Sequence, residues 1–108
     1  MRKIYLIHLK EQDISGVRRK GEVRTVVEGR QNPFATSDLV RAIEKGVTDL
    51  DTSADYILPV GSSLVNFLSG LVLGLKRPRS LKLMIHDAKS GEYKEVVLNM
   101  NLEVRDGR

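Results

Sequence analysis

Residues 56–75 read YILPVGSSLVNFLSGLVLGL, and this stretch decides the fold. Its twenty residues carry no charge, which by length alone is enough to span a bilayer. However, a proline, a glycine and two serines interrupt it at 59–63, and the apolar run that remains, 64–75, is too short to cross. We therefore predict a short buried strand over 56–60, a tight turn and a buried helix over 64–75, with no membrane segment.

The flanking segments predict four further strands and one more helix. Residues 3–9 are apolar on both alternating faces, as in a central strand that is covered on both sides. Residues 22–28 alternate β-branched and charged side chains, which is typical of a half-exposed strand at an edge. The other expected elements are a helix capped by Thr36 or Ser37 and ending near Gly46, and strands over 81–86 and 93–100 with a hairpin loop at 87–91.

The order of elements is then strand, strand, helix, strand, helix, strand, strand (β-β-α-β-α-β-β). The helix over 64–75 connects two strands as a right-handed crossover, so these strands should be parallel. We place the strand over 3–9 beside them, in the middle of the sheet. The length of 108 residues suits one α/β domain, an abbreviated Rossmann-like fold with a mixed sheet of about five strands. This single domain spans 1–108, and residues 103–108 are expected to form a frayed tail.

Composition excludes several classes of function. The chain has no cysteine, which excludes a disulfide scaffold, thiolate catalysis and a cysteine-based zinc site. With only two histidines as well, we expect no metal and no cofactor. Lysine and arginine total 18 against 14 acidic residues, a net charge of +4. That balance favours a polyanionic partner such as nucleic acid or a nucleotide, although it is also an ordinary charge for solubility.

The turn at 61–63 is the best candidate for a binding site. Open α/β sheets bind ligands beyond the carboxyl ends of their strands, and a helix N-terminus suits phosphate. A basic loop at 18–20 would rise from the same edge, whereas the cations at 76–79 would lie at the opposite pole. Two plainer interpretations stay open: a serine that only caps the helix, and solvated basic loops. The candidate phosphate or nucleic-acid site comprises Arg18, Arg19, Lys20, Gly61, Ser62, Ser63, Asn66 and His86.

The helix over 64–75 offers a different function, because it is apolar nearly all round. If part of it stays exposed, it marks a surface for a partner, either a second copy of the chain or a host or viral protein. The alternative is complete burial. The candidate interface residues are Phe67, Gly70, Leu71 and Gly74, in which the glycines would allow close approach.

No motif in the chain is diagnostic of an enzyme. There is no nucleophile elbow, no H-E-x-x-H and no paired-carboxylate signature, so we assign no catalytic residue. We expect His8 to be a hydrogen-bonded residue of the core or of a strand end. The leading hypothesis is a non-enzymatic accessory protein that binds a phosphate-bearing partner. A small phosphodiesterase or nuclease that uses Ser62, Ser63 and His86 remains an alternative.

One family resemblance covers about half of the chain. The segments DYILPVGSSLVNFLSGLVLG and LKLMIHDAKSGEYKEV combine an apolar strand, a small-residue turn, an apolar helix and a strand that ends in a D-x-x-x-G-x-Y hairpin. In this they resemble small α/β accessory proteins of bacteriophages and other mobile elements. The resemblance implies a cytoplasmic, non-housekeeping protein, and it transfers no catalytic residue.

Overall fold

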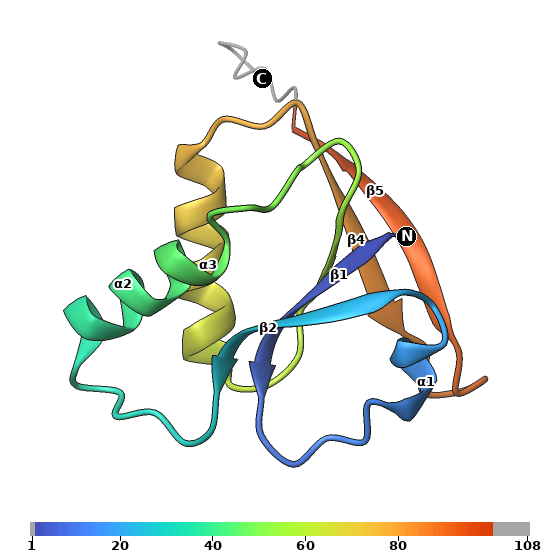
Figure 1. Cartoon of the computed structure of the whole chain (residues 1–108), viewed down its shortest axis with the longest axis horizontal. Coiled ribbons are helices and arrows are strands. Elements are labelled where there is room, and N and C mark those ends of the chain that lie inside the picture. The colour runs from blue at the N-terminus through green and yellow to red at the C-terminus, as the bar shows by residue number, and fades with distance from the viewer. Residues whose placement is uncertain (1, 101–108) are drawn as a thin grey trace, which may run out of the picture.

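A mixed sheet of five strands carries the fold of the computed structural model, which describes residues 2–100 (Figure 1). The strands are β1 (Lys3–Leu9), β2 (Glu22–Glu28), β3 (Tyr56–Leu58), β4 (Ser80–His86) and β5 (Tyr93–Asn99). Their order in the sheet is β2-β1-β3-β4-β5. The first four run parallel to their neighbours, and β5 is antiparallel to β4. The predicted α/β class and mixed sheet are confirmed, with β1 inside the sheet and β2 at an edge.

Strand β1 is the buried centre of the sheet, as its unbroken apolar run predicts. Ile4 pairs with Val23 of β2 on one side and with Tyr56 of β3 on the other. Successive side chains of a strand point to opposite faces, so Tyr5 and Ile7 enter one core while their neighbours enter a second core. Both faces of β1 are therefore covered.

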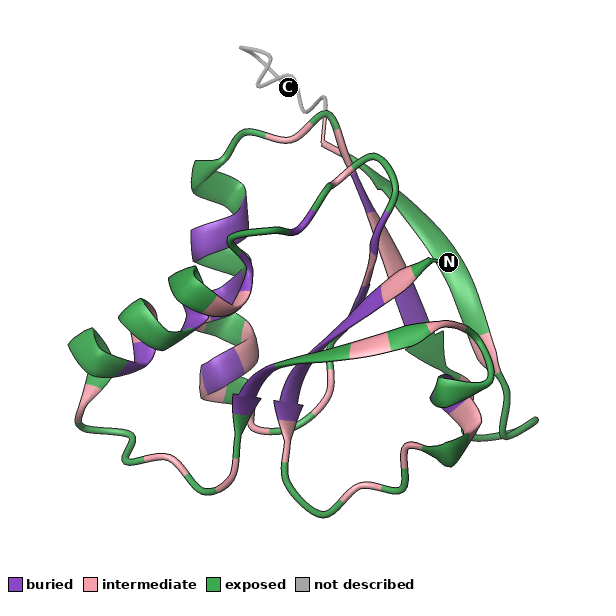
Figure 2. Ribbon diagram, viewed as in Figure 1, coloured by how far each residue is buried: buried purple, intermediate pink, exposed green. Residues whose placement is uncertain are grey.

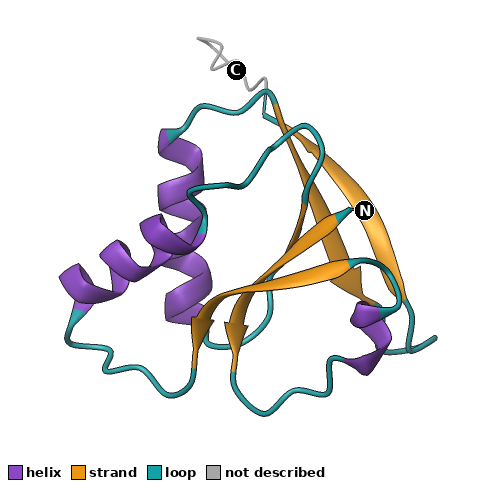
Figure 3. Cartoon of the chain, viewed as in Figure 1, coloured by secondary structure: helices purple, strands orange, loops and turns teal. Residues whose placement is uncertain are grey.

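The two longer helices, α2 (Thr36–Gly46) and α3 (Ser63–Leu75), lie on one side of the sheet, and α1 (Ser15–Arg18) lies on the other (Figure 3). On the first side, α2 buries Leu39 and Ile43, and α3 buries Val65, Val72 and Leu73. On the second side the core is smaller and consists of Ile4, Leu6, Val17, Leu58 and Met84. The sheet is thus well covered on one face and thinly covered on the other.

The segment 10–21, in which the sequence analysis predicts no helix, is a crossover that contains the extra helix α1. Because β2 runs parallel to β1, the chain must return to the end of the sheet where β1 begins. It arrives there at Glu22, whose N–H donates to the carbonyl of Arg2 at 2.9 Å. Along the way Ile14 and Val17, three residues apart, pack against the second core. This crossover covers the face that the longer helices leave bare.

The N-termini of α2 and α3 are capped in different ways. Neither Thr36 nor Ser37 caps α2, whose N-cap is Ala35 without a side-chain hydrogen bond, so that prediction is wrong. Ser62 caps α3, and its hydroxyl oxygen accepts from the Val65 N–H at 3.2 Å. Within residues 2–100, no helix is both long and apolar enough to cross a membrane. The tail expected at 103–108 lies outside the described residues.

Substitution by alanine should change the stability of the protein in opposite directions at two glycines that lie in helices. A Cβ on Gly46 would lie 2.8 Å from Val26 Cγ1 and 3.0 Å from the Val26 carbonyl oxygen. Gly46→Ala should therefore destabilise the fold by about 1–3 kcal/mol. Gly70 has open space around it, so Gly70→Ala should stabilise α3 by about 0.5–1 kcal/mol. Urea unfolding of the two variants checks both signs, and equal effects would contradict the packing of α2 on β2.

Candidate functional site

The carboxyl ends of β1, β2 and β3 meet at the side chain of His8. Its Nε2 lies 2.6 Å from the carbonyl oxygen of Gly29, just after β2, and its Nδ1 lies 3.0 Å from the backbone N of Ser62, at the start of α3. A backbone N–H can only donate, so Nδ1 is the acceptor and the proton sits on Nε2. His8 is 1% exposed. The chain itself thus fills the place where open α/β sheets bind ligands, and the expectation of a hydrogen-bonded His8 is confirmed.

Gly61 makes this arrangement possible. Its φ of +95° lies in the left-handed region, which glycine adopts without strain. A Cβ at this position would overlap the Cβ and the carbonyl oxygen of His8. Gly61 therefore allows the turn that follows β3 to lie directly against the end of β1.

The other polar groups of the turn are largely engaged within the chain. The Ser62 N–H donates to His8, and its hydroxyl oxygen caps α3. The side-chain N–H groups of Asn66 donate to the carbonyl oxygens of Val60 and Ser62, both at 2.9 Å. The buried Oδ1 of Asn66 has no partner. Most of the hydrogen-bonding capacity of this turn therefore holds the fold, which favours the capping interpretation of Ser62.

A second group of predicted site residues gathers between α1 and the hairpin that joins β4 to β5. Arg19 and Lys20 line a pocket of about 370 Å³ together with Gly91, Glu92 and Tyr93. An adjoining pocket of about 510 Å³ shares several of these walls. Its lining residues are Gln12, Asp13, Ser15, Gly16, Val60, His86, Gly91 and Tyr93. We call the two pockets together the α1–hairpin groove.

The structure therefore divides the predicted site into two parts. Arg19, Lys20 and His86 come together along the α1–hairpin groove. Arg18 ends α1 and is exposed, but it lines neither pocket. The remaining four residues, Gly61, Ser62, Ser63 and Asn66, line neither pocket and belong to the turn beside His8. In the part of the chain that the structure describes, no hydrogen bond joins either serine to His86.

Tyr93 is a residue of the groove that the sequence analysis did not select. It pairs with His86 across the β4–β5 ladder, and the two ring centroids lie 5.0 Å apart at 55°. His86 is exposed and Tyr93 is half-buried. The signal was present in the sequence, because the short hairpin between the strands sets this register. The pair offers aromatic surface beside two cations.

The groove also contains acidic groups. The backbone N–H of Ser15 donates to Asp13 Oδ1 at 3.0 Å and is the main cause that lowers the pKa of this carboxyl; the charge of Arg19 adds to it. Asp13 is therefore ionised at neutral pH, and with Glu92 it partly offsets the cations. The net positive charge of the groove is therefore small.

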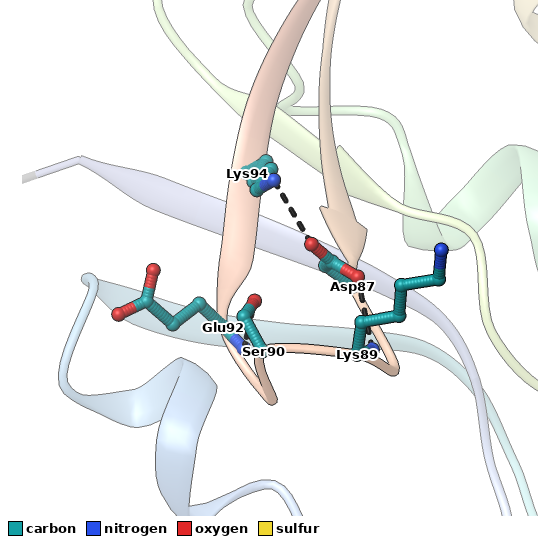
Figure 4. A network of polar contacts seen from close by, with 5 residues as sticks. All are labelled: Asp87, Lys89, Ser90, Glu92 and Lys94. Carbon is teal, nitrogen blue, oxygen red and sulfur yellow. Dashed lines mark hydrogen bonds and ion pairs between the residues drawn. The ribbon is translucent and has the colours of Figure 1, made fainter.

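Polar contacts within the hairpin fix the far wall of the groove (Figure 4). The ammonium of Lys94 lies 2.9 Å from Asp87 Oδ2, and the Lys89 N–H donates to Asp87 Oδ1 at 3.0 Å. These contacts, with Lys94 first, lower the pKa of Asp87. Gly91 closes the turn with a φ of +74°. The loop is thus held in one shape against α1.

The outward face of α3 exposes large apolar side chains. Phe67 is 65% exposed and Leu75 is 83% exposed, with Leu71 between them. A Cβ added at Gly70 or Gly74 would meet no atom within 4 Å. Complete burial of the helix is therefore excluded, and Figure 2 shows alternating buried and exposed turns along α3. We call Phe67, Gly70, Leu71, Gly74 and Leu75 the α3 stripe.

The stripe ends in a basic pocket at the opposite pole of the molecule from His8. This pocket has a volume of about 770 Å³ and is lined by Gly74, Arg77, Pro78, Arg79, Asn99 and Met100. Arg77 has a φ of +49°, a conformation that usually belongs to glycine after a helix end. Its N–H donates to the Gly74 carbonyl at 3.0 Å. A strained backbone thus holds a cation at the pocket. The cations at 76–79 were expected at this pole, without a site assigned to them.

Comparison with known families places the chain among phage proteins. A family model described as "Phage Pam3 gp32-like protein" matches residues 4–100, which is almost all of the described chain. The chain belongs to this family. The resemblance to small phage proteins is therefore confirmed. No curated protein and no solved structure matches the chain, so this family membership assigns no role to any residue.

His8→Leu should destabilise the fold, because the half-buried Ser62 N–H loses its partner and the Gly29 carbonyl keeps only the longer hydrogen bond from Gln31 Nε2 at 3.3 Å. We expect a loss of about 1–3 kcal/mol in the free energy of unfolding. His86→Leu, at an exposed strand end, is the matched control and should change it by less than about 0.5 kcal/mol. Urea unfolding followed by circular dichroism measures both, and similar small losses would contradict the central role of His8.

Proposed function

We propose that this phage protein is a non-enzymatic accessory protein that works by docking to a partner protein through the α3 stripe. The partner segment is an amphipathic helix that is apolar on one face and acidic at one end. One observation carries this proposal: an exposed apolar helix face runs directly into a pocket lined by Arg77 and Arg79.

The apolar part of the surface supplies affinity. Burying a large apolar side chain such as Phe67 or Leu75 contributes about 1.5–3 kcal/mol relative to leaving it in water. Gly70 and Gly74 lie on the same stripe with open space above them, so a second helix can approach the α3 backbone closely. Glycine costs helix stability in water, which is a reason to look for a compensating contact.

The charged part of the surface sets the chemistry of the partner. Arg77 and Arg79 line the pocket at the end of the stripe. The neighbouring ammonium of Lys76 points elsewhere and donates to the Val47 carbonyl at 3.1 Å. Guanidinium groups bind carboxylates through paired hydrogen bonds, so the matching end of the partner helix should carry Asp or Glu.

Two designed peptides test this proposal by fluorescence anisotropy. Both are amphipathic helices with leucines on one face, and one carries glutamates at one end where the other carries glutamines. The acidic peptide should bind at least about fivefold more tightly, since a charge-assisted pair is worth about 1 kcal/mol or more. Gly70→Trp should weaken both peptides, because its side chain fills the place of the partner helix.

The sharpest variant is Arg77→Gly. It removes the guanidinium and also the left-handed strain, so the protein should fold at least as well as the original while its preference for the acidic peptide disappears. Arg41→Gly on α2, which removes an exposed arginine far from the pocket lining, is the control for net charge. Equal binding of both peptides to the unmodified protein would refute the proposed partner chemistry.

A second candidate function keeps the phosphate-bearing partner, now at the α1–hairpin groove. It rests on the meeting of Arg19 and Lys20 with the ring pair of His86 and Tyr93. Cations for phosphates beside an exposed ring for a base are what single-stranded nucleic acids and nucleotides require. This candidate no longer depends on the serines of the turn at 61–63.

Anisotropy with a labelled single-stranded oligonucleotide at low and at physiological salt tests the second candidate. Arg19→Glu with Lys20→Glu should weaken binding at least about tenfold at low salt, because phosphate contacts dominate such affinity. Arg30→Glu with Arg41→Glu makes the same change in net charge at exposed sites elsewhere. If both double variants lose the same affinity, binding is a general charge effect and the groove is not the site.

A further inference from the structure

Phe34 is a large aromatic side chain that the fold leaves in water. It is 92% exposed, more than Phe67 or Leu75 on α3. It belongs to the connector 29–35 between β2 and α2, and within residues 2–100 it is a member of neither core. The fold therefore does not need this ring for its packing, whereas aromatic side chains are frequent anchors of protein interfaces.

Two hydrogen bonds hold the turn that carries Phe34. The N–H of Phe34 donates to Asn32 Oδ1 at 2.9 Å, and the N–H of Ala35 donates to the Asn32 carbonyl at 3.1 Å. Pro33 lies between them, and its own ring restricts the backbone φ to a value that suits a turn. We call residues 32–34 the Phe34 turn. Because this turn is already ordered, binding to it costs little further conformational entropy.

A pocket with two cations lies along the same connector. It has a volume of about 570 Å³, and its lining residues are Lys10, Glu11, Gln12, Gly29 and Arg30. Its two walls are the loop after β1 and the start of the connector, which lie together at the lower edge of the molecule in Figure 1. With two cations and one acidic residue, this lining favours an anionic group.

Glutamine side chains brace both walls of this pocket. In the first wall, Gln12 Nε2 donates to the His8 carbonyl at 3.0 Å. In the second, Gln31 Nε2 donates to the Gly29 carbonyl at 3.3 Å. The N–H of Gly29 also donates to the Leu9 carbonyl at 2.8 Å and joins the two walls. The backbone that carries the two cations is therefore fixed by the fold.

We propose that the Phe34 turn and this pocket together form a docking surface for a partner protein. Phe34 enters an apolar pocket of the partner, and an aspartate or glutamate at the rim of that pocket binds Arg30. Four residues separate Phe34 from Arg30, a chain length of at most about 14 Å, so one interface of ordinary size covers both. This goes beyond the proposed function, because it uses no residue of the α3 stripe.

The charge of the pocket and the single ring select the chemistry of the partner. The guanidinium of Arg30 can bind a carboxylate through two parallel hydrogen bonds, and the ammonium of Lys10 adds a second positive charge. A protein pocket surrounds the ring of Phe34 and removes it from water, whereas a lipid surface holds a protein through a larger apolar face. These features favour a protein with an acidic rim over a membrane.

A small host molecule tests the chemistry of this surface on the full chain. β-Cyclodextrin has an apolar cavity that accepts a phenyl ring, and its carboxylated derivative adds a rim of carboxylates. Phe34 and Phe67 are the two phenylalanines of the chain, so NMR titration can follow both rings. At low salt the carboxylated host should bind Phe34 at least about fivefold more tightly than the neutral host does. This preference should be larger at Phe34 than at Phe67.

Matched variants separate the ring, the charge and the turn. Phe34→Ala should abolish host binding at this site and leave the urea midpoint unchanged, since the ring packs in neither core. Arg30→Gln should remove the preference for the carboxylated host, and Arg41→Gln, the same change at an exposed position of α2, should keep it. Asn32→Ala removes the Oδ1 acceptor and should weaken binding about threefold or more. A preference that is equal at both phenylalanines, or that survives Arg30→Gln, would overturn the proposed chemistry.

Site-specific cross-linking identifies the partner. With p-benzoylphenylalanine in place of Phe34, irradiation of infected bacterial cells should link the chain to one protein, at an apolar pocket with Asp or Glu at its rim. The purified partner should bind the Phe34→Ala variant at least about tenfold more weakly and the Gly70→Trp variant as well as the unmodified chain. The absence of a cross-link, a cross-link to a second copy, to nucleic acid or to lipid, or capture of the same protein by the photoreactive residue in place of Arg41 would each overturn the proposal.

Discussion

The imidazole of His8 is the contact on which the rest of the structure depends. Its Nδ1 accepts a hydrogen bond from the N–H of Ser62, the N-cap of α3, and its Nε2 donates to the carbonyl of Gly29, just after β2. One buried ring therefore fixes three strand ends and the start of a helix. The ring can do both only when it is neutral and protonated at Nε2. The position of α3 follows from this contact, and with it the direction of its apolar stripe.

A second constraint is the small number of helices that can cover the two faces of the sheet. Five strands present two faces, yet the described residues form only two helices of more than four residues, and both lie over the same face. The crossover with α1 covers part of the other face with Ile14 and Val17. Within residues 2–100 little covers the last strand, so its residues after Tyr93 are exposed, whereas residues 4–8 of β1 are buried. The exposed surfaces of the protein follow from the small number of helices that cover the sheet.

Much of the fold could be predicted from local patterns of apolar and polar residues in the sequence. The apolar run of 3–9 identified the central strand, and the break at 59–63 separated β3 from α3 almost to the residue. Segment 10–21 was missed as a crossover because only Ile14 and Val17 carry an apolar signal among polar neighbours. The predicted cap at Thr36 or Ser37 was wrong because α2 already begins at Thr36, so its N-cap is Ala35, whose methyl side chain has no hydrogen-bond acceptor.

The candidate site was less predictable, because its contacts are distant in sequence. His8 and Ser62 lie 54 residues apart, and His8 and Gly29 lie 21 apart, so no spacing rule could link them. From the sequence alone, every polar group near the turn at 61–63 was an equal candidate for binding a ligand, whereas in the structure most of these groups form hydrogen bonds within the chain. The strain at Arg77 is likewise a property of the backbone after α3, and no residue pattern signals it.

Strand β3 has only three residues, yet both halves of the sheet join through it. On one side β1, α1 and β2 are close in sequence, and on the other β4 and β5 form a hairpin. Such local units can form quickly, whereas β3 must close a loop of some fifty residues to reach β1. From this topology we expect the joining of the two halves through the short central strand to be a late step of folding.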